Sequence, residues 1–118
     1  MKSAQDPRHL SRIKTVKELF ASSFTKQPAQ TELTREVLAK SKELDKQIQE
    51  NAPTWPVDKL NKIDLAVLRL ATYELIYTKE PPKAIIDEAV EIAKKYGTES
   101  SASFINGVLG TIMESKNG

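Results

Sequence analysis

The stretch IIDEAVEIAKKYGTESSASFINGVLGTI, residues 85–112, decides the fold of this chain. At about 100° per residue, apolar side chains of its first half fall on one arc of a helix: Ile85, Ile86, Ala89, Val90, Ile92, Ala93 and Tyr96. Gly97 then stands where a helix commonly ends, and residues 98–101 supply hydroxyl groups that can cap a second helix. A second apolar face follows, formed by Phe104, Ile105, Val108, Leu109, Ile112 and Met113. The stretch therefore predicts a hairpin of two amphipathic helices.

The rim of the second helix has two interpretations. Gly107 and Gly110 fall together on its outer side, so they leave a smooth strip that another backbone or a ligand can approach. Phe104 lies at the edge of the apolar face. It serves either as a core residue or as an exposed platform on which a base stacks.

The remaining chain also predicts helices, because apolar residues recur at helical spacing and no stretch alternates as a strand would. The expected elements are helices over residues 7–24, 31–51 and 64–78, a short helix near 57–61, and a linker at 27–30. The fold class is therefore all-α. In the first helix we expect Leu10, Phe20 and Phe24 to belong to an inward stripe.

The segment 64–78 is apolar nearly all round, which places it in the middle of the fold. Its Arg69 is a charged exception. A buried charge needs a partner, and Glu88 is the carboxylate that we expect to pair with it. By contrast, Asp87 and Glu91 fall with Glu88 on the outward side of their helix and indicate a solvated face.

Length and composition limit the classes of protein. The chain has 118 residues, which predicts a single domain over 1–118, and it has no cysteine, which excludes disulfides and thiolate metal sites. The first residues, MKSAQDPRHL, lack the apolar run of a secretory signal, and no apolar run is long enough to cross a bilayer. We therefore expect a cytoplasmic protein that has no contact with a membrane.

Positive charge is concentrated near the N-terminus. Residues 1–26 hold six Lys or Arg against two Asp or Glu, although the whole chain carries only +2. Such a segment is typical of a polyanion binder, or else of an ordinary solvated helix face. Arg8 and Arg12 lie one turn apart and are expected to point away from the inward stripe, as phosphate contacts or as plain surface charge. His9 between them is expected to be a surface residue.

The residues that enzymes use are not grouped in this sequence. The single histidine lies in the basic segment, and no CxxC, HExxH, EF-hand, GxGxxG or Walker-type motif is present. We therefore predict a protein that is not an enzyme and that uses no cofactor or metal.

Residues 63–112 resemble the NusB family of transcription antitermination factors. The similar positions read LRLATYEL at 68–75, Pro81, IDEAVEIAKKYG at 86–97 and FINGVL at 104–109. More loosely, the basic first helix and Trp55 ahead of Leu60 also agree. The resemblance implies an all-helical NusB-like bundle of two packed antiparallel helical subdomains.

The resemblance also implies a function. NusB proteins bind boxA-type RNA of nascent, especially ribosomal, transcripts together with the ribosomal protein NusE, and so act on the transcribing RNA polymerase complex. It implies RNA contacts at Arg8, Arg12, Phe20 and Phe104, and NusE contacts near Asp58, Asp64 and Glu74.

Two other functions fit the sequence. One is a helical protein–protein adaptor of the same fold that does not bind RNA. The other is a recognition module for an RNA methyltransferase, which would have to be a separate protein. The sequence leaves open whether the protein is a monomer or a homodimer.

Overall fold

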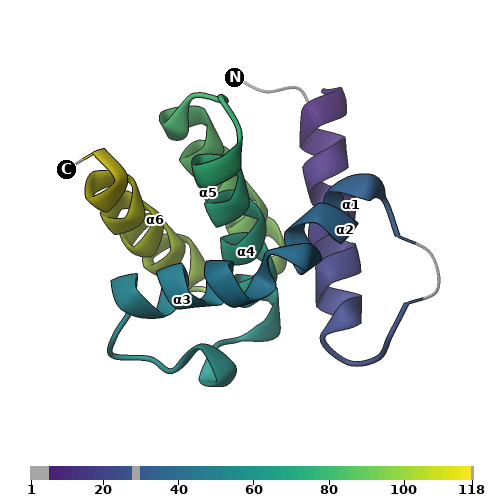
Figure 1. Cartoon of the computed structure of the whole chain (residues 1–118), viewed down its shortest axis with the longest axis horizontal. Coiled ribbons are helices and arrows are strands. Elements are labelled where there is room, and N and C mark those ends of the chain that lie inside the picture. Colours follow the sequence, from purple (N-terminus) through teal and green to yellow (C-terminus); the bar gives the residue numbers. More distant parts are fainter. Residues whose placement is uncertain (1–5, 28–29, 118) are drawn as a thin grey trace.

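The computed structural model describes residues 6–27 and 30–117 of the chain. Within these residues the elements are α1 (Pro7–Ser22), α2 (Glu32–Ala39), α3 (Ser41–Asn51), the 3-10 helix η1 (Val57–Lys59), α4 (Lys62–Tyr77), α5 (Pro82–Tyr96) and α6 (Ser101–Asn117). No strand occurs among them, so the expected all-helical fold is confirmed (Figure 1). Lys2 of the basic segment and Pro28 of the expected linker lie outside the described residues.

Short polar side chains set where the helices begin. The Asp6 carboxylate accepts from the backbone N–H of Arg8 at 2.9 Å and caps α1. Asn61 does the same for α4, accepting from the N–H of Ile63 at 2.8 Å. Thr31 caps α2 through its hydroxyl. Each cap satisfies an amide that has no partner within its own helix.

Helix α4 lies at the centre of the bundle. It packs against α1, α3, α5 and α6, which surround it in Figure 1. Its buried residues include Leu65, Leu68, Leu70 and Leu75, and they join one continuous apolar core. The expectation that this segment lies in the middle of the fold is therefore confirmed. The physical reason is that a helix with apolar side chains on every side must be covered by other helices on every side to keep those side chains from water.

The expected single helix over residues 31–51 is wrong. The chain turns at Lys40, whose φ of −105° and ψ of 10° leave the helical range, so α2 and α3 are separate. The turn has a packing reason: α2 lies against α1 and α4, whereas α3 lies against α4 and α6. Val37 on α2 and Leu44 on α3 are both fully buried as a result.

The inward stripe of α1 is only partly correct. Val16 and Leu19 are buried, and Ile13 and Phe20 pack against the core. The residues at the two ends of the expected stripe are exposed instead, Leu10 at 49% and Phe24 at 65%. Because α1 ends at Ser22, Phe24 lies in the turn that follows and is not on a helical face.

The α5–α6 hairpin has the two apolar faces expected from its sequence. Ile85, Ile92, Ile105 and Leu109 are among the fully buried residues that join it to α4. Its place at the end of α5 suggested that Gly97 is needed for the backbone conformation that ends a helix, but any residue can adopt its φ of −94°. Glycine is needed there for a different reason. A Cβ there would lie 2.8 Å from the carbonyl oxygen of Ala93 and 2.5 Å from Ser101 Oγ. Glycine thus permits the close approach of α6 to the end of α5.

Candidate functional site

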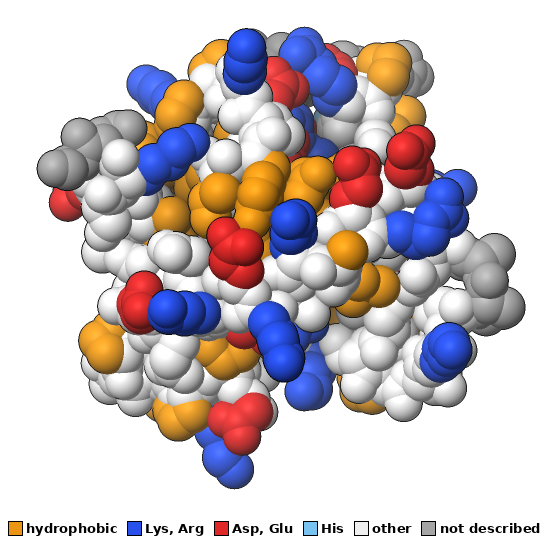
Figure 2. Space-filling model, in the orientation of Figure 1, with side chains coloured by type: hydrophobic (Ala, Val, Ile, Leu, Met, Phe, Trp, Pro, Cys, Tyr) orange, Lys and Arg blue, Asp and Glu red, His pale blue; other side chains and the backbone are white. Residues whose placement is uncertain are grey.

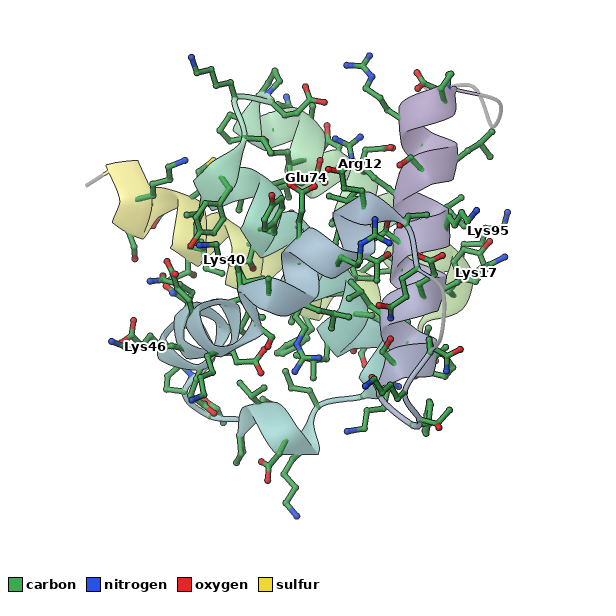
Figure 3. The ribbon with its side chains drawn as sticks, turned by 45° about the vertical axis from the view of Figure 1, so that its right-hand side comes forward. Arg12, Lys17, Lys40, Lys46, Glu74 and Lys95 are labelled. Atoms are coloured by element: carbon green, nitrogen blue, oxygen red, sulfur yellow. The ribbon has the colours of Figure 1, made fainter. Side chains whose placement is uncertain are left out.

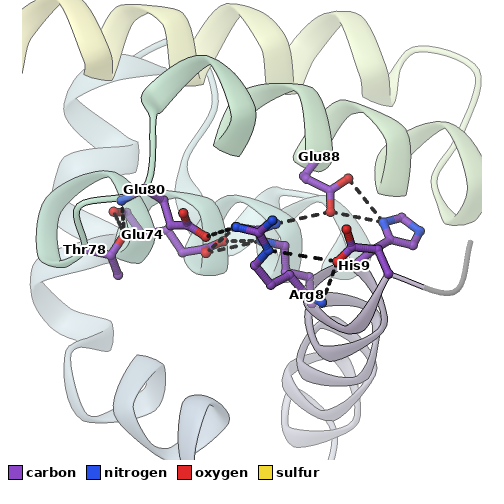
Figure 4. A network of polar contacts seen from close by, with 8 residues as sticks. Arg8, His9, Glu74, Thr78, Glu80 and Glu88 are labelled. Atoms are coloured by element: carbon purple, nitrogen blue, oxygen red, sulfur yellow. Dashed lines mark hydrogen bonds and ion pairs between the residues drawn. The ribbon is translucent and has the colours of Figure 1, made fainter. Parts of the chain in front are cut away.

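Arg12 binds two carboxylates from other helices. Its Nε and Nη2 donate to the two oxygens of Glu74 on α4, at 2.9 and 2.8 Å, in a bidentate pair. Its Nη1 donates to Glu88 on α5 at 3.2 Å. Glu80 lies at the edge of this network, 3.4 Å from Nη2 (Figure 4). The network ties the first helix to two helices that lie more than 60 residues further along the chain.

The expectation that Arg12 points into solvent is wrong. Only 7% of the residue is exposed. Burial by itself would lower the pKa of Arg12, but the hydrogen bonds and charges of Glu74 and Glu88 outweigh it and raise the pKa. Its charge is therefore neutralised inside the protein and is not presented to an external anion.

Glu88 is also placed differently from the expectation. It lies on the inward side of α5, 1% exposed, and His9 Nδ1 approaches it at 3.1 Å. It therefore does not pair with Arg69, which binds both carboxylate oxygens of Asp45 on α3 at 2.8 Å each. Asp87 and Glu91 are exposed, as expected.

Arg8 is the arginine that faces solvent in this region. Its side chain is 72% exposed, with its Nη1 3.6 Å from Glu80 and its Nε 4.0 Å from Asp6. Exposed pairs of this kind are weak, so the guanidinium can exchange them for a phosphate. Phe20 is half-buried against the core and meets the exposed Phe24 edge to face, with ring centroids 5.0 Å apart.

The three carboxylates expected to face a protein partner have different surroundings. Asp58 is exposed in η1. Glu74 is buried and holds Arg12. Asp64 is buried at the start of α4, on the wall of a surface hollow. Of the three, Asp58 alone has a side chain open to contact across a flat interface.

The hollow lies where η1, the start of α4 and the start of α6 meet. It encloses about 330 Å³ and is lined by Trp55, Lys59, Leu60, Asn61, Asp64, Ser100 and Phe104. Phe104 packs partly against the core and partly faces the hollow, so it has a core role, and its role as a stacking platform stays a prediction. Trp55, which comes two residues before η1, is 56% exposed. Trp55 was noted in the sequence only as a point of family resemblance, and it adds a second aromatic side chain to the hollow.

The arginine network and the hollow lie at opposite ends of α4. Glu74 marks one end and Asp64 the other, ten residues apart, which is about 15 Å of helix. Arg8 and Phe104, both predicted to contact RNA, are therefore not neighbours. A ligand that touches both must extend along the molecule.

A second basic surface, which sequence analysis missed, lies between α1 and α5. Lys17 of α1 and Lys95 of α5 approach the ring of Tyr96 from two helices, each with its Nζ 5.5 Å from the ring centroid. Figure 3 shows these two lysines side by side, away from the buried pair of Arg12 and Glu74. The sequence signal was Lys95 next to Tyr96, but its pairing with Lys17 depends on how the helices pack.

The face that carries α2 and α3 is different. In Figure 2 its positive and negative side chains are interspersed, and apolar side chains gather in a strip near the centre. Tyr73 and Tyr77 of α4 stack here with centroids 5.2 Å apart, and Lys40 lies 5.1 Å from the Tyr77 ring. Mixed charge of this kind does not suit a polyanion.

The described residues form neither a metal site nor a membrane-spanning helix. Across residues 6–27 and 30–117, no group of His, Asp and Glu side chains is placed to hold a metal ion. No described helix is both long enough and apolar enough to cross a membrane.

Comparison with known proteins assigns this arrangement to a family. The model of the NusB family matches residues 7–114. A transcription antitermination protein NusB from Macrococcus caseolyticus is 46% identical over 85 residues, which is 72% of this chain and 65% of that protein. One from Treponema denticola is 52% identical over 71 residues, 59% of this chain and 52% of its own length. The chain thus spans about half to two thirds of these relatives.

Solved structures agree. NusB of T. maritima superimposes with a TM-score of 0.82 at 32% identity, over 97% of this chain and 93% of that one. A second structure is described as a complex of antitermination factors NusB and NusE with double-stranded RNA. One of its chains superimposes with a TM-score of 0.79 at 23% identity, over 92% of this chain and 96% of that one. The second likeness concerns the fold alone. The family match, together with the shared arrangement of helices, shows that this chain belongs to the NusB family.

Proposed function

We propose that this protein is a non-catalytic adaptor that binds boxA-type RNA of nascent transcripts jointly with the ribosomal protein NusE, and that the complex acts on transcribing RNA polymerase in the cytoplasm. The supporting observation is the family match over residues 7–114. The names of the relatives add to it, since they are transcription antitermination proteins, and one structural neighbour was solved with NusE and RNA.

The structure suggests how RNA would be held. Arg8, Lys17 and Lys95 are exposed cations that can neutralise phosphates, and Tyr96 offers a ring between two of them. Phe104 supplies a partly exposed ring at the Asp64 end of α4, the opposite end from the arginine network. Single-stranded RNA recognition commonly joins such cations to stacking rings. Arg12 contributes by holding α1 in place.

The test is a titration of fluorescently labelled boxA RNA, with and without NusE, at two salt concentrations. We expect binding that weakens with salt and strengthens when NusE is present. The variant that combines Arg8→Ala, Lys17→Ala and Lys95→Ala should lower affinity and reduce the salt slope by roughly two units, about 0.7 for each lost contact to single-stranded RNA. The matched control replaces Lys40, Lys42 and Lys46 on the opposite side of the bundle by alanine.

Arg12→Ala is not a suitable probe of RNA binding, because the loss of its buried pairs would disturb the fold. No RNA binding in any condition, with NusE still bound, would favour the adaptor that binds proteins only. One observation favours that second candidate: the neutralised charge of Arg12 leaves the basic segment with fewer free cations than the sequence indicates. In that case Asp58→Lys should weaken the NusE complex, and sedimentation of the free protein would show whether it is a monomer or a homodimer.

A further inference from the structure

Glu80 contacts two arginines of α1 from the turn that joins α4 to α5. Its Oε1 lies 3.6 Å from Nη1 of the exposed Arg8 and 3.4 Å from Nη2 of the buried Arg12 (Figure 4). The side chain of Glu80 is 30% exposed, whereas that of Glu74, which holds Arg12 at 2.8 Å, is 10% exposed. Of these two carboxylates, Glu80 is therefore the one that can turn out into water.

The backbone of this turn is held in place independently of the Glu80 carboxylate. The backbone N–H of Glu80 donates to the hydroxyl of Thr78 at 3.4 Å, and that hydroxyl donates to the carbonyl oxygen of Glu74 at 2.7 Å. Pro81 follows and restricts the backbone of the residue before it. A rotation of the Glu80 side chain alone can therefore release the carboxylate. Arg12 keeps its two other carboxylate partners when this happens.

A cleft of about 250 Å³ lies at this point, and Arg8, Ser11 and Glu80 are among the residues that line it. The Arg8 guanidinium and the exposed Ser11 hydroxyl can each donate to a phosphate oxygen. The Glu80 carboxylate can only accept hydrogen bonds, and its negative charge repels a phosphate that approaches Arg8. The carboxylate and a phosphate group therefore compete for the same guanidinium.

We propose that Glu80 is an intramolecular competitor for Arg8. Its carboxylate pairs with the guanidinium in the free protein and turns out into solvent when an RNA phosphate enters the cleft. This inference rests on the proposed function, because it assumes that Arg8 binds RNA. It adds a residue that lowers RNA affinity to a surface otherwise described only by residues that raise it.

The test is a double-mutant cycle between Glu80→Gln and Arg8→Ala, in which the anisotropy of labelled boxA RNA measures affinity with NusE present. Glutamine removes the charge, and its amide oxygen can still accept a hydrogen bond from Arg12. We expect Glu80→Gln to bind RNA about threefold more tightly than the wild type does, because an exposed ion pair no longer has to be broken. In the protein that carries Arg8→Ala, this gain should disappear.

Two further variants separate the ion pair from the general effect of charge. Asp87→Asn is the matched control, because it removes an exposed carboxylate of α5. It should change affinity by less than about 1.5-fold, and equally with and without Arg8. Glu80→Asp keeps the charge but shortens the side chain by one methylene group, which weakens the pair with Arg8, so it should raise affinity about twofold. Far-ultraviolet circular dichroism checks that each variant is folded.

The outcomes distinguish this inference from the proposed function. RNA binding by Glu80→Gln at the wild-type affinity, or a gain that is the same with and without Arg8, would overturn the inference and keep the function. An affinity below that of the wild type would mean that Glu80 holds Arg8 in position for RNA, which also overturns the inference. A complete absence of RNA binding in every variant would remove both.

Discussion

The two ends of α4 carry similar residue types but use them differently. At the end near Glu74, the carboxylates of Glu74 and Glu88 hold one buried arginine. At the end near Asp64, a carboxylate oxygen that solvent does not reach has no hydrogen-bond partner in the described chain, beside a hollow that Trp55 and Phe104 line. The first end is satisfied internally, whereas the second leaves a buried polar atom unpaired.

A charged residue in the sequence of this protein is not necessarily free to bind a ligand. The basic first helix suggested a row of phosphate contacts, yet its central arginine is part of the structure. Asp64 was expected to contact a protein partner, yet it is buried, and it lines a hollow together with two aromatic side chains. A charged residue is available to a ligand only when its own protein does not already neutralise it. The substitutions below test this difference between the two ends, from the largest expected effect on stability to the smallest.

Arg12→Ala should cost the most. It leaves the carboxylates of Glu74 and Glu88 buried without their shared cation, and breaking a buried pair in this way costs about 3–5 kcal/mol. Urea denaturation followed by circular dichroism measures the loss. Lys14→Ala, an exposed cation on the same helix, is the control and should change the free energy of unfolding by less than about 0.5 kcal/mol. Similar small effects from both would mean that the network does not hold α1.

Gly97→Ala should cost about 1–3 kcal/mol, because the added methyl group would overlap the carbonyl of Ala93 and the hydroxyl of Ser101. Gly107→Ala is the matched control in α6, where nothing lies within 4 Å of the added carbon. It should raise stability by up to about 1 kcal/mol through helix propensity alone. Thermal melting of the two variants gives the comparison, and equal shifts would contradict the close approach at Gly97.

Glu18→Gln should have a smaller effect that depends on pH. Burial alone would raise the pKa of Glu18, but hydrogen bonds from Thr34 and Thr31 lower it below its ordinary value of 4.5. A carboxyl group whose pKa is lower in the folded state stabilises the protein above its unfolded pKa, and this stabilisation is lost as the pH falls through the folded pKa. We expect a cost of about 1 kcal/mol at neutral pH.

The difference between wild type and Glu18→Gln should then shrink as the pH falls below 4.5, when the wild-type carboxyl group becomes protonated. Urea midpoints measured across this range give the result. Glu32→Gln, an exposed carboxylate in the first turn of α2, is the control. A difference that stays constant with pH would show that the hydrogen bonds do not favour the charged form.

Asp64→Ala should have the smallest effect, below about 1 kcal/mol. The substitution removes a favourable charge from the first turn of α4, worth about 0.3–1 kcal/mol, but it also removes a buried oxygen that has no partner among residues 6–27 and 30–117. The two terms oppose each other. A loss as large as that of Arg12→Ala, in the same urea experiment, would show that the two ends of α4 do not differ in the way described.

Sequence alone predicted the features that depend on local periodicity. The faces of α5 and α6 and the burial of α4 follow from apolar spacing, and the structure confirms them. The break at Lys40 was missed because no glycine or proline marks it, and the turn follows from which neighbours α2 and α3 cover. Arg12 was expected at the surface and Arg69 was paired with Glu88, and both expectations were wrong because the actual partners come from other helices.

The candidate site was predictable to a lesser degree. Phe104 was identified from the family motif, and it does line the hollow. The roles of Arg8, Phe20 and Asp58 stay predictions. Trp55 and Asp64 meet Phe104 only because η1 folds back beside the start of α6, and no periodicity in the sequence reports this. Likewise, Lys17 and Lys95 become neighbours only through helix packing.

The central position of α4 has a consequence for motion. Because all five other α-helices of the described chain contact it, its backbone amides should exchange with solvent deuterium only when the whole protein unfolds. The three-residue η1 and its flanking prolines have few buried side chains, so this segment should exchange at a much lower opening free energy. One wall of the hollow is therefore anchored to the slowest-exchanging part of the protein, while the wall that carries Trp55 can move without loosening the core.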